Sequence, residues 1–510
     1  MARLALKPDS SFFRKIAIGA IGARAVCGDL ARHHHEMYEL ERGSTDTKLW
    51  EEVKRKRVRI PDLVCVRCGL RIESRAKTAP DLSMSHSQTD EARSWDFGMV
   101  DTDLIAFPVC EAVDERYWSS GRLGDESSYW HERNWVRWQI KGWINYFLVR
   151  AFRSTPHART TTKGVTEGSE TSISWPAIFS ARTGIVEART GQKITLRRAS
   201  DGHRHTRTLP DAFQIFVGEG ESVETNQVIA SVVQPLTRDE LICTRQMPQG
   251  HIQNLLNSRE RTQRFTAVKL ARLRQEAAYR DSIAELARDE EEDVYIRLEA
   301  VSYLAAVCGH PVAALFTPYL NSPDQQNQLE AVIALGETAT EDAVQLLSSI
   351  LDNNSQPYFL RSTAAWSLSR VGREEAVRRL VAAFADVDSN IRDEALEGIV
   401  SIGGPATPLL FAGLRELNDI GAGCAEALRQ QKRIPNDIVE RLIRELRTSN
   451  PSPWTVWLVG SLPREYAAGA IAELQETSPE LHYAITLLWR FIESWISRRW
   501  ESKPGTDFPS

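Results

Sequence analysis

The sequence predicts a multidomain α+β protein with a mixed front half and an all-α back half. Its 510 residues are 42% hydrophobic and 26% charged, as in a folded globular chain rather than a disordered or collagen-like one. Apolar residues alternate with a period of two within residues 63–77 and 176–235, which is typical of strands. From about residue 261 apolar residues recur at helical spacing, in a unit that itself repeats along the chain.

The first domain is expected over residues 1–115 as an α/β domain. A helix is predicted for residues 17–42, followed by strands at 63–66 and 70–77. The turn Arg67-Cys68-Gly69 joins the two strands. A further apolar strand is expected at residues 104–109, preceded by Asp101 and Asp103.

Acidic and basic side chains on these strands form the sharpest chemical pattern in the sequence. Asp62 opens the first strand, and Glu73, Arg75 and Lys77 share one face of the second. Two carboxylates on adjacent strands can hold a hard cation such as Mg²⁺, and a neighbouring cation stabilises charge that develops on a phosphate. These residues are therefore candidates for a metal-dependent hydrolase.

The pattern looks like the restriction-endonuclease-like superfamily, whose motif is Pro-Asp, a variable gap, then an acid, any residue and Lys. The resemblance covers about residues 30–110. It implies a nuclease-like domain in which Asp62 and Glu73 bind Mg²⁺ while Arg75 and Lys77 assist at the phosphate. Arg75 stands where the family has Lys, and arginine is a poor proton-handling group. The family often adds a helix carboxylate, for which Glu36 or Glu39 is expected.

A zinc site competes for the same region. Cys65-x-x-Cys68-Gly69 has the spacing of a turn that aims two thiolates at one ion. Cys110 and His86 are the candidates for the remaining ligands, and such a zinc would be structural. It does not exclude the nuclease. The plain alternative is that Cys65 is a buried strand residue and Glu73 a surface charge.

Residues 116–175 are expected to form an aromatic-rich helix and a linker. On a helix, Arg133, Arg137 and Lys141 lie one turn apart and make a basic stripe beside Trp135. Basic and aromatic side chains together suit a single-stranded nucleic acid. The alternative is an amphipathic helix that buries its tryptophans.

Residues 176–240 are expected to form a small β module. A hairpin with Gly191-Gln192 at its turn precedes a stretch that looks like the corner of barrel-sandwich (biotinyl/lipoyl-like) domains. Carriers of that family hold their prosthetic group on a lysine at a hairpin tip, and no lysine matches here, so a carrier role is not expected. Arg197 and Arg198 belong to a basic set that either contacts phosphates or forms a solvated face.

Residues 255–450 are expected to form an all-α solenoid. A small residue recurs with spacings of 31, 33, 31 and 30 at Ala300, Ala331, Ala364, Ala395 and Ala425. The units resemble the HEAT-repeat family over about residues 262–450, which implies a curved surface for binding protein or nucleic acid and no chemistry of its own. We expect Gly421 and Gly423 to weaken the last unit and the tryptophan-rich residues 451–510 to form a helical cap.

Charge is divided along the chain. Residues 1–280 hold 43 Lys and Arg against 34 Asp and Glu, a net +9, and residues 281–510 hold 20 against 34, a net −14. A basic front half suggests a nucleic-acid partner. Seven scattered cysteines and the lack of a long apolar run favour a cytoplasmic protein that does not enter a membrane.

Two functions remain open from the sequence. The first is a nucleic-acid-binding protein with a divergent Mg²⁺-dependent nuclease domain, of use in prokaryotic defence or repair. The alternative is a non-enzymatic adaptor, in which a zinc-stabilised front module recognises one partner and the solenoid binds a protein.

Overall fold

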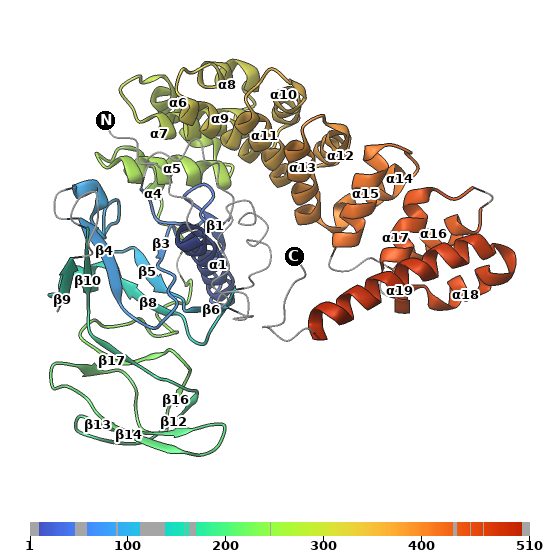
Figure 1. The fold of residues 1–510 in the computed structure, drawn as a ribbon. Coiled ribbons are helices and arrows are strands. Elements are labelled where there is room, and N and C mark those ends of the chain that lie inside the picture. Colours follow the sequence, from blue (N-terminus) through green and yellow to red (C-terminus); the bar gives the residue numbers. More distant parts are fainter. Residues whose placement is uncertain are drawn as a thin grey trace. The chain divides into compact units, whose positions relative to one another are not determined.

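The computed structural model describes residues 10–45, 59–87, 90–112, 138–157, 159–162, 170–244, 246–431, 436–448, 450–462 and 464–501. The chain divides into two compact units, Met1–Tyr303 and Leu304–Ser510. The first unit holds the β-sheets and the second is helical (Figure 1). The α+β class predicted from the sequence is confirmed, with the strands in the N-terminal part of the chain and the helical array in the C-terminal part.

A five-stranded mixed sheet forms the centre of the front domain. Its strand order is β1-β2-β3-β5-β8. Antiparallel pairing joins β1 to β2, β2 to β3 and β5 to β8, while β3 and β5 run parallel. The strands are β1 (Met37–Glu39), β2 (Leu63–Cys65), β3 (Arg71–Ser74), β5 (Leu104–Phe107) and β8 (Asn145–Leu148). The predicted hairpin over residues 63–77 and the strand at 104–109 are thus present.

Helix α1 (Ser10–Arg32) packs on one face of this sheet. Its Val26 and Leu30 share a core with Ile72, Leu104 and Tyr146. The sequence prediction extended this helix to residue 42, but the helix ends at Arg32 and β1 follows. The stop has a local cause, since His34 adopts a φ of 67°, which a helix does not tolerate.

The opposite face of the sheet carries a second apolar core. Ile105, Phe107 and Phe147 alternate along their strands with the residues that face α1, so they point away from it. They pack with Trp95 and Phe152 and with a three-stranded sheet in the order β4-β10-β9. The elements here are β4 (Ser83–Ser87), η2 (Glu91–Arg93), β6 (Cys110–Ala112), β7 (Trp138–Ile140), α3 (Val149–Arg153), β9 (Arg159–Thr162) and β10 (Glu170–Ser174).

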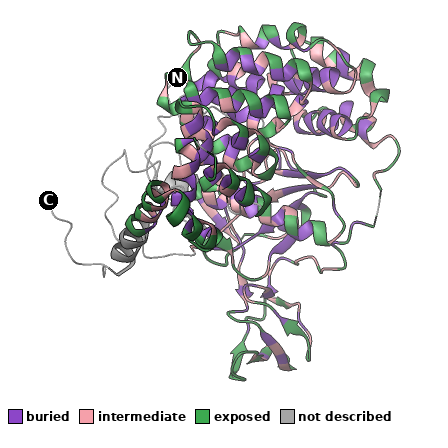
Figure 2. Ribbon diagram, turned by 90° about the vertical axis from the view of Figure 1, so that its right-hand side faces the viewer, coloured by how far each residue is buried: buried purple, intermediate pink, exposed green. Residues whose placement is uncertain are grey.

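The small β module consists of two sheets with the orders β11-β17-β15 and β14-β13-β12-β16. The predicted hairpin is present, because Thr190 pairs with Lys193 across the two-residue turn Gly191-Gln192. Val186, Ile194 and Val223 belong to its core, while β14 is exposed throughout. Exposed residues, drawn green, alternate with buried ones at the lower end of Figure 2. The strands are β11 (Ala177–Phe179), β12 (Gly184–Thr190), β13 (Lys193–Arg198), β14 (Arg204–Thr208), β15 (Gln214–Ile215), β16 (Ser222–Val223) and β17 (Val228–Ser231).

Buried charges hold the first helices of the array to the front domain. Glu299 has no exposed surface; it accepts a hydrogen bond from Arg42, just after β1, and one of 2.6 Å from Arg272 Nε. Lys269 Nζ lies 3.9 Å from the same carboxylate. Because Lys269 and Arg272 lie on α5 and Glu299 on α7, these ion pairs link two helices to the sheet domain. The helices are α4 (His251–Leu256), α5 (Arg261–Leu273), η5 (Ala277–Tyr279), α6 (Arg280–Arg288) and α7 (Val294–Ala306).

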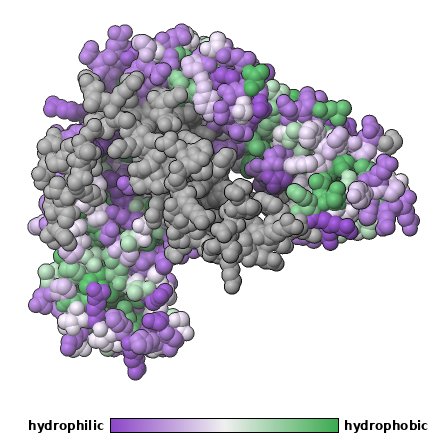
Figure 3. Space-filling view, in the orientation of Figure 1, coloured by the Kyte–Doolittle hydropathy of each residue, from purple (hydrophilic) through white to green (hydrophobic). Residues whose placement is uncertain are grey.

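The second unit is an array of short helices with polar caps. Asp324 and Asp388 accept hydrogen bonds from the backbone N–H groups of Gln326 and Asn390, so they cap α9 and α13. On the face shown in Figure 3, hydrophilic residues predominate at the top of the view, where α8 and α10 of this unit lie. The helices are α8 (Val312–Leu320), α9 (Gln325–Thr338), α10 (Glu341–Asp352), α11 (Tyr358–Val371), α12 (Glu374–Ala382), η6 (Ala383–Ala385), α13 (Ser389–Ile402), η7 (Gly404–Ala406), α14 (Thr407–Gly413), α15 (Asp419–Gln430), α16 (Asn436–Leu446), α17 (Pro453–Ser461), η8 (Arg464–Tyr466), α18 (Ala468–Thr477) and α19 (Pro479–Glu501).

The repeated small residues have the packing role that their spacing suggests. All five repeated alanines, from Ala300 to Ala425, are fully buried. Helix α15 runs without a break through Gly421 and Gly423, the two residues that we expect to weaken the last unit. A Cβ at Gly421 would meet Trp454 Cδ1 at 2.4 Å, and one at Gly423 would meet Phe384 Cγ at 2.4 Å. The glycines therefore permit close helix packing.

Candidate metal centres

Asp62 and Glu73 are neighbours across two adjacent strands. Leu63 pairs with Ile72 in the antiparallel β2–β3 hairpin, so the next pair in the same register is Asp62 and Glu73. The backbone N–H of Ser74 donates a hydrogen bond of 2.8 Å to Asp62 Oδ2. The hairpin thus brings together the two carboxylates that the sequence singled out.

Both carboxylic acids are harder to ionise than in water. Burial raises the pKa of Asp62 well above its usual value, and the neighbouring charges of Glu73 and Glu41 raise it further. Burial also raises the pKa of Glu73, against the opposing effect of Arg75 and Arg59. Such a pair favours bound positive charge, either a proton or a cation. Glu41 follows β1 and was not among the predicted carboxylates.

The two predicted basic residues differ in their surroundings. Arg75 Nη2 lies 3.1 Å from Glu73 Oε1 and donates a hydrogen bond of 3.1 Å to the carbonyl oxygen of Trp95. Lys77 instead donates to the carbonyl oxygen of Ser83, and its Nζ lies 3.2 Å from Asp81 Oδ1. Arg75 is therefore beside the acidic pair, and Lys77 is held at the start of β4.

The other predicted acids serve local structure. Glu39 lies on β1 rather than on a helix, and its Oε1 accepts a hydrogen bond of 2.9 Å from the backbone N–H of Thr45. Glu36 lies just before that strand and accepts one of 3.2 Å from Tyr38. The helix carboxylate expected from the resemblance is absent at both positions, because α1 ends before them.

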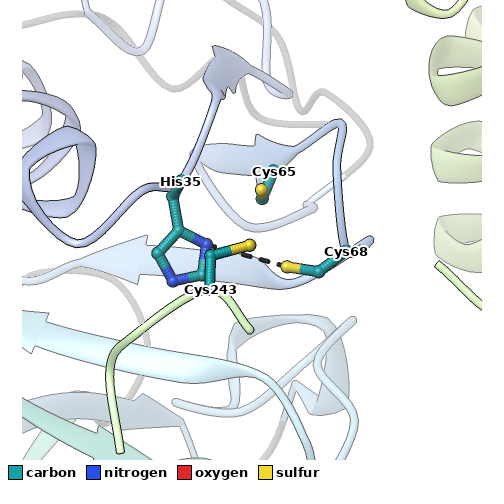
Figure 4. A group of neighbouring side chains, drawn as sticks. All are labelled: His35, Cys65, Cys68 and Cys243. Atoms are coloured by element: carbon teal, nitrogen blue, oxygen red, sulfur yellow. Dashed lines mark hydrogen bonds between the residues drawn. The ribbon is translucent and has the colours of Figure 1, made fainter. Parts of the chain in front are cut away.

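Four donor side chains converge near the turn of the hairpin. The donor atoms of His35, Cys65, Cys68 and Cys243 all lie within 4.8 Å of one another. Figure 4 shows the imidazole of His35 and the three thiols directed toward a common centre. Cys68 Sγ and His35 Nδ1 are 3.6 Å apart. Cys65 is fully buried, His35 and Cys243 are each 7% exposed, and Cys68 is partly exposed, so three of the four side chains are buried.

The ionisation of each cysteine in the cluster depends on the cysteine beside it. Hydrogen bonding from Cys68 lowers the pKa of the Cys65 thiol, and His35 and the backbone N–H groups of Cys68 and Glu36 lower it further. The pKa of Cys68 is raised in turn, because Cys65 carries the negative charge beside it. The cluster therefore favours a thiolate on Cys65 while Cys68 and Cys243 keep their protons more readily.

The ligand set differs from the one expected from sequence. Cys65 and Cys68 are in the cluster, but Cys110 is buried on β6 beside Ile18 and Trp138, with its Sγ 3.9 Å from the Ile18 carbonyl oxygen. His86 lies on β4 and pairs with Thr171 of β10. Cys243 and His35 were missed because they are far from Cys65 in sequence; the histidine was assigned to a helix that in fact ends before it.

The predicted nucleic-acid residues are only partly within the described residues. Arg133, Trp135 and Arg137 lie outside them. Lys141 follows strand β7 rather than continuing a helix, so the expected stripe does not reach it, and its Nζ lies 2.6 Å from Glu111. On the β module, Arg198 pairs with Asp201 at 2.7 Å and Arg197 lies 4.0 Å from Glu187.

Comparison with known proteins supports the helical repeat. Residues 312–400 match the HEAT-repeat family. Among solved structures, Escherichia coli YibA is 14% identical, with a TM-score of 0.24 over 48% of this chain and 92% of its own. Human deoxyhypusine hydroxylase is 20% identical, with a TM-score of 0.18 over 45% and 86%. The CpcE–CpcF complex of Nostoc phycocyanin lyase is 18% identical, with a TM-score of 0.20 over 41% and 92%. No curated protein matches the chain.

Membrane-spanning segments were sought among the helices of the described residues. None of those helices alone is both long and apolar enough to cross a bilayer. The bent pair Ser389–Ile402 and Gly404–Gly413 passes on length and composition only.

Proposed function

We propose that this chain is a HEAT-repeat scaffold whose front domain is a divergent metal-dependent nuclease. The observation that carries the proposal is the acidic pair: Asp62 and Glu73 are opposite one another on antiparallel strands, and burial raises the pKa of both. A pair of this kind is costly to keep ionised without a compensating cation, and perturbed carboxylates are common at functional sites.

The residues present suit a hard divalent ion. Carboxylate oxygens are the ligands that Mg²⁺ prefers, and Asp62 and Glu73 would hold it, with Glu41 nearby. When bound, the ion supplies Lewis acidity at a phosphate. Glu73 orients Arg75 through their ion pair, and the guanidinium stabilises negative charge on the substrate.

Positive charge around the pair suits a polyanionic substrate. Burial lowers the pKa of the Arg59 guanidinium, and the neighbouring charges of Arg93 and Arg75 lower it further, so three guanidinium groups lie close together here. Residues 1–280 as a whole also carry a net positive charge. A phosphodiester backbone is the substrate class that this charge favours.

The test is Mg²⁺-dependent cleavage of single- and double-stranded DNA and RNA by the full chain. Asp62→Asn and Glu73→Gln should reduce cleavage by at least about a hundredfold, as loss of a catalytic electrostatic group does. Asp101→Asn is the matched control, because Asp101 is exposed and its carboxylate pairs with Arg153. Equal cleavage by wild type and the Asp62 variant would refute the assignment.

A non-enzymatic adaptor is the second candidate. It is favoured by Lys77, the lysine closest to the expected motif position, because its ammonium group contacts Ser83 and Asp81. In that case the HEAT repeats bind a protein partner and the front domain recognises a second one. Absence of cleavage on every substrate, together with no effect of Mg²⁺ on the melting temperature, would select the adaptor.

A further inference from the structure

The cluster of three cysteines and one histidine has the geometry of a single-ion site. Zinc bonds of about 2.3 Å to sulfur and about 2.0–2.1 Å to nitrogen place tetrahedral ligands about 3.8 Å (S to S) and about 3.6 Å (S to N) apart. The separation from Cys68 Sγ to His35 Nδ1 is 3.6 Å, and all four donor atoms lie within 4.8 Å of one another. A cluster of several iron atoms needs a wider cage than this.

The surroundings of the histidine prepare it for a metal. Its Nε2 is 2.8 Å from the carbonyl oxygen of Leu241, so that nitrogen carries the proton and Nδ1 directs its lone pair toward the thiols. Metal-bound histidines are usually held in this way by a backbone carbonyl or a carboxylate. This contact is independent of the cysteines and points to the same centre.

The ligands come from three separate segments that are also joined by backbone hydrogen bonds. The N–H of Cys243 donates a hydrogen bond of 2.9 Å to the carbonyl oxygen of His33. The N–H of Met247 donates one of 2.8 Å to the carbonyl oxygen of Arg67. An ion at the centre therefore joins the turn after α1, the β2–β3 turn and the segment that leads to α4. His35, Cys65 and Cys243 are buried and Cys68 is partly exposed, and a site closed by four protein ligands is typical of a structural ion.

We propose that His35, Cys65, Cys68 and Cys243 form a structural Zn²⁺ site that clamps the segment around Cys243 onto the β2–β3 hairpin. Soft thiolates with one imidazole select zinc over the hard cations suited to carboxylates. The site is distinct from the acidic pair in ligand chemistry. It does not depend on the proposed nuclease, because its test is metal content and not cleavage.

The experiment is elemental analysis of the purified full chain, expressed with zinc and washed free of loosely bound metal. We expect about one zinc per chain in the wild type and less than about a tenth of that in His35→Ala and Cys243→Ser. Cys110→Ala and His251→Ala are matched controls that should keep the metal. Cys110 lies beside Ile18, and His251 lies near Gly69 but outside the donor set.

A second measurement covers variants that fail to fold. Cys243→His keeps a four-ligand site with two thiolates in place of three, so it should retain a metal. Cobalt(II) exchanged into it should keep the visible bands of a tetrahedral ion, with about two thirds of the thiolate charge-transfer absorbance. Wild type without zinc, zinc retained by Cys243→Ser, iron in place of zinc, or an unchanged cobalt spectrum in Cys243→His would each overturn the proposal.

Discussion

Replacement of Glu299 by glutamine tests whether buried charges join the first repeat helices to the front domain. Glu299 has no exposed surface, and Arg42, Lys269 and Arg272 beside it are each at most 5% exposed. The side chain accepts hydrogen bonds from Arg42 and Arg272. Each bond to a charged group contributes about 1.5–3 kcal/mol, and removal of one partner of a buried ion pair costs about 3–5 kcal/mol.

We therefore expect Glu299→Gln to lower the free energy of unfolding of the first unit by about 3–5 kcal/mol. Arg42→Met should cost less, because Glu299 keeps Arg272 and Lys269. The control is Glu276→Gln, which breaks a partly exposed ion pair with Arg274 and should cost about 0–1 kcal/mol.

The assay is native-state hydrogen exchange of amides in α5 and the central sheet, which reports this unit separately from the rest of the chain. A loss below about 1 kcal/mol for Glu299→Gln would contradict the reasoning, since it would mean that water reaches these charges.

Three further outcomes are expected. Folding raises the pKa of Asp62 and of Glu73, so both groups stabilise the fold fully when the pH is below their unfolded pKa values near 3.8 and 4.5. This stabilisation is lost as the pH rises through their pKa values in the folded protein. In chelator, Asp62→Asn should therefore melt higher than wild type at pH 8, with the gap closing toward pH 4; a lower melting temperature at pH 8 would exclude this. Gly423→Ala should cost about 1–3 kcal/mol in thermal unfolding, because the new Cβ meets the Phe384 ring. Gly469→Ala, where a Cβ meets open space within helix α18, should add about 0.5–1 kcal/mol; similar effects at both glycines would refute the packing argument. A strong zinc chelator should lower the melting temperature of wild type and leave that of Cys243→Ser unchanged, whereas an equal shift in both would indicate a metal elsewhere.

Local patterns predicted much of the fold. The hairpin that carries Asp62 and Glu73 follows from period-two alternation around a Cys-Gly turn, and the register that sets the two acids opposite one another depends only on residues close in sequence. The helical array follows from the recurring alanines, since one helix pair cannot bury its apolar face alone. Where the local pattern was ambiguous it misled, as at residues 33–42, where apolar spacing continued past the helix end.

The sequence by itself determined the repeat, the hairpin and the Cys65–Cys68 half of the metal cluster, because each depends on short-range spacing. Only the tertiary structure decided the other half. His35 and Cys243 meet that turn because α1 ends early and because the chain leaving the β module returns to the sheet. Contacts between such distant segments are selected by the burial of apolar surface over the whole domain, and spacing along the chain carries no record of them.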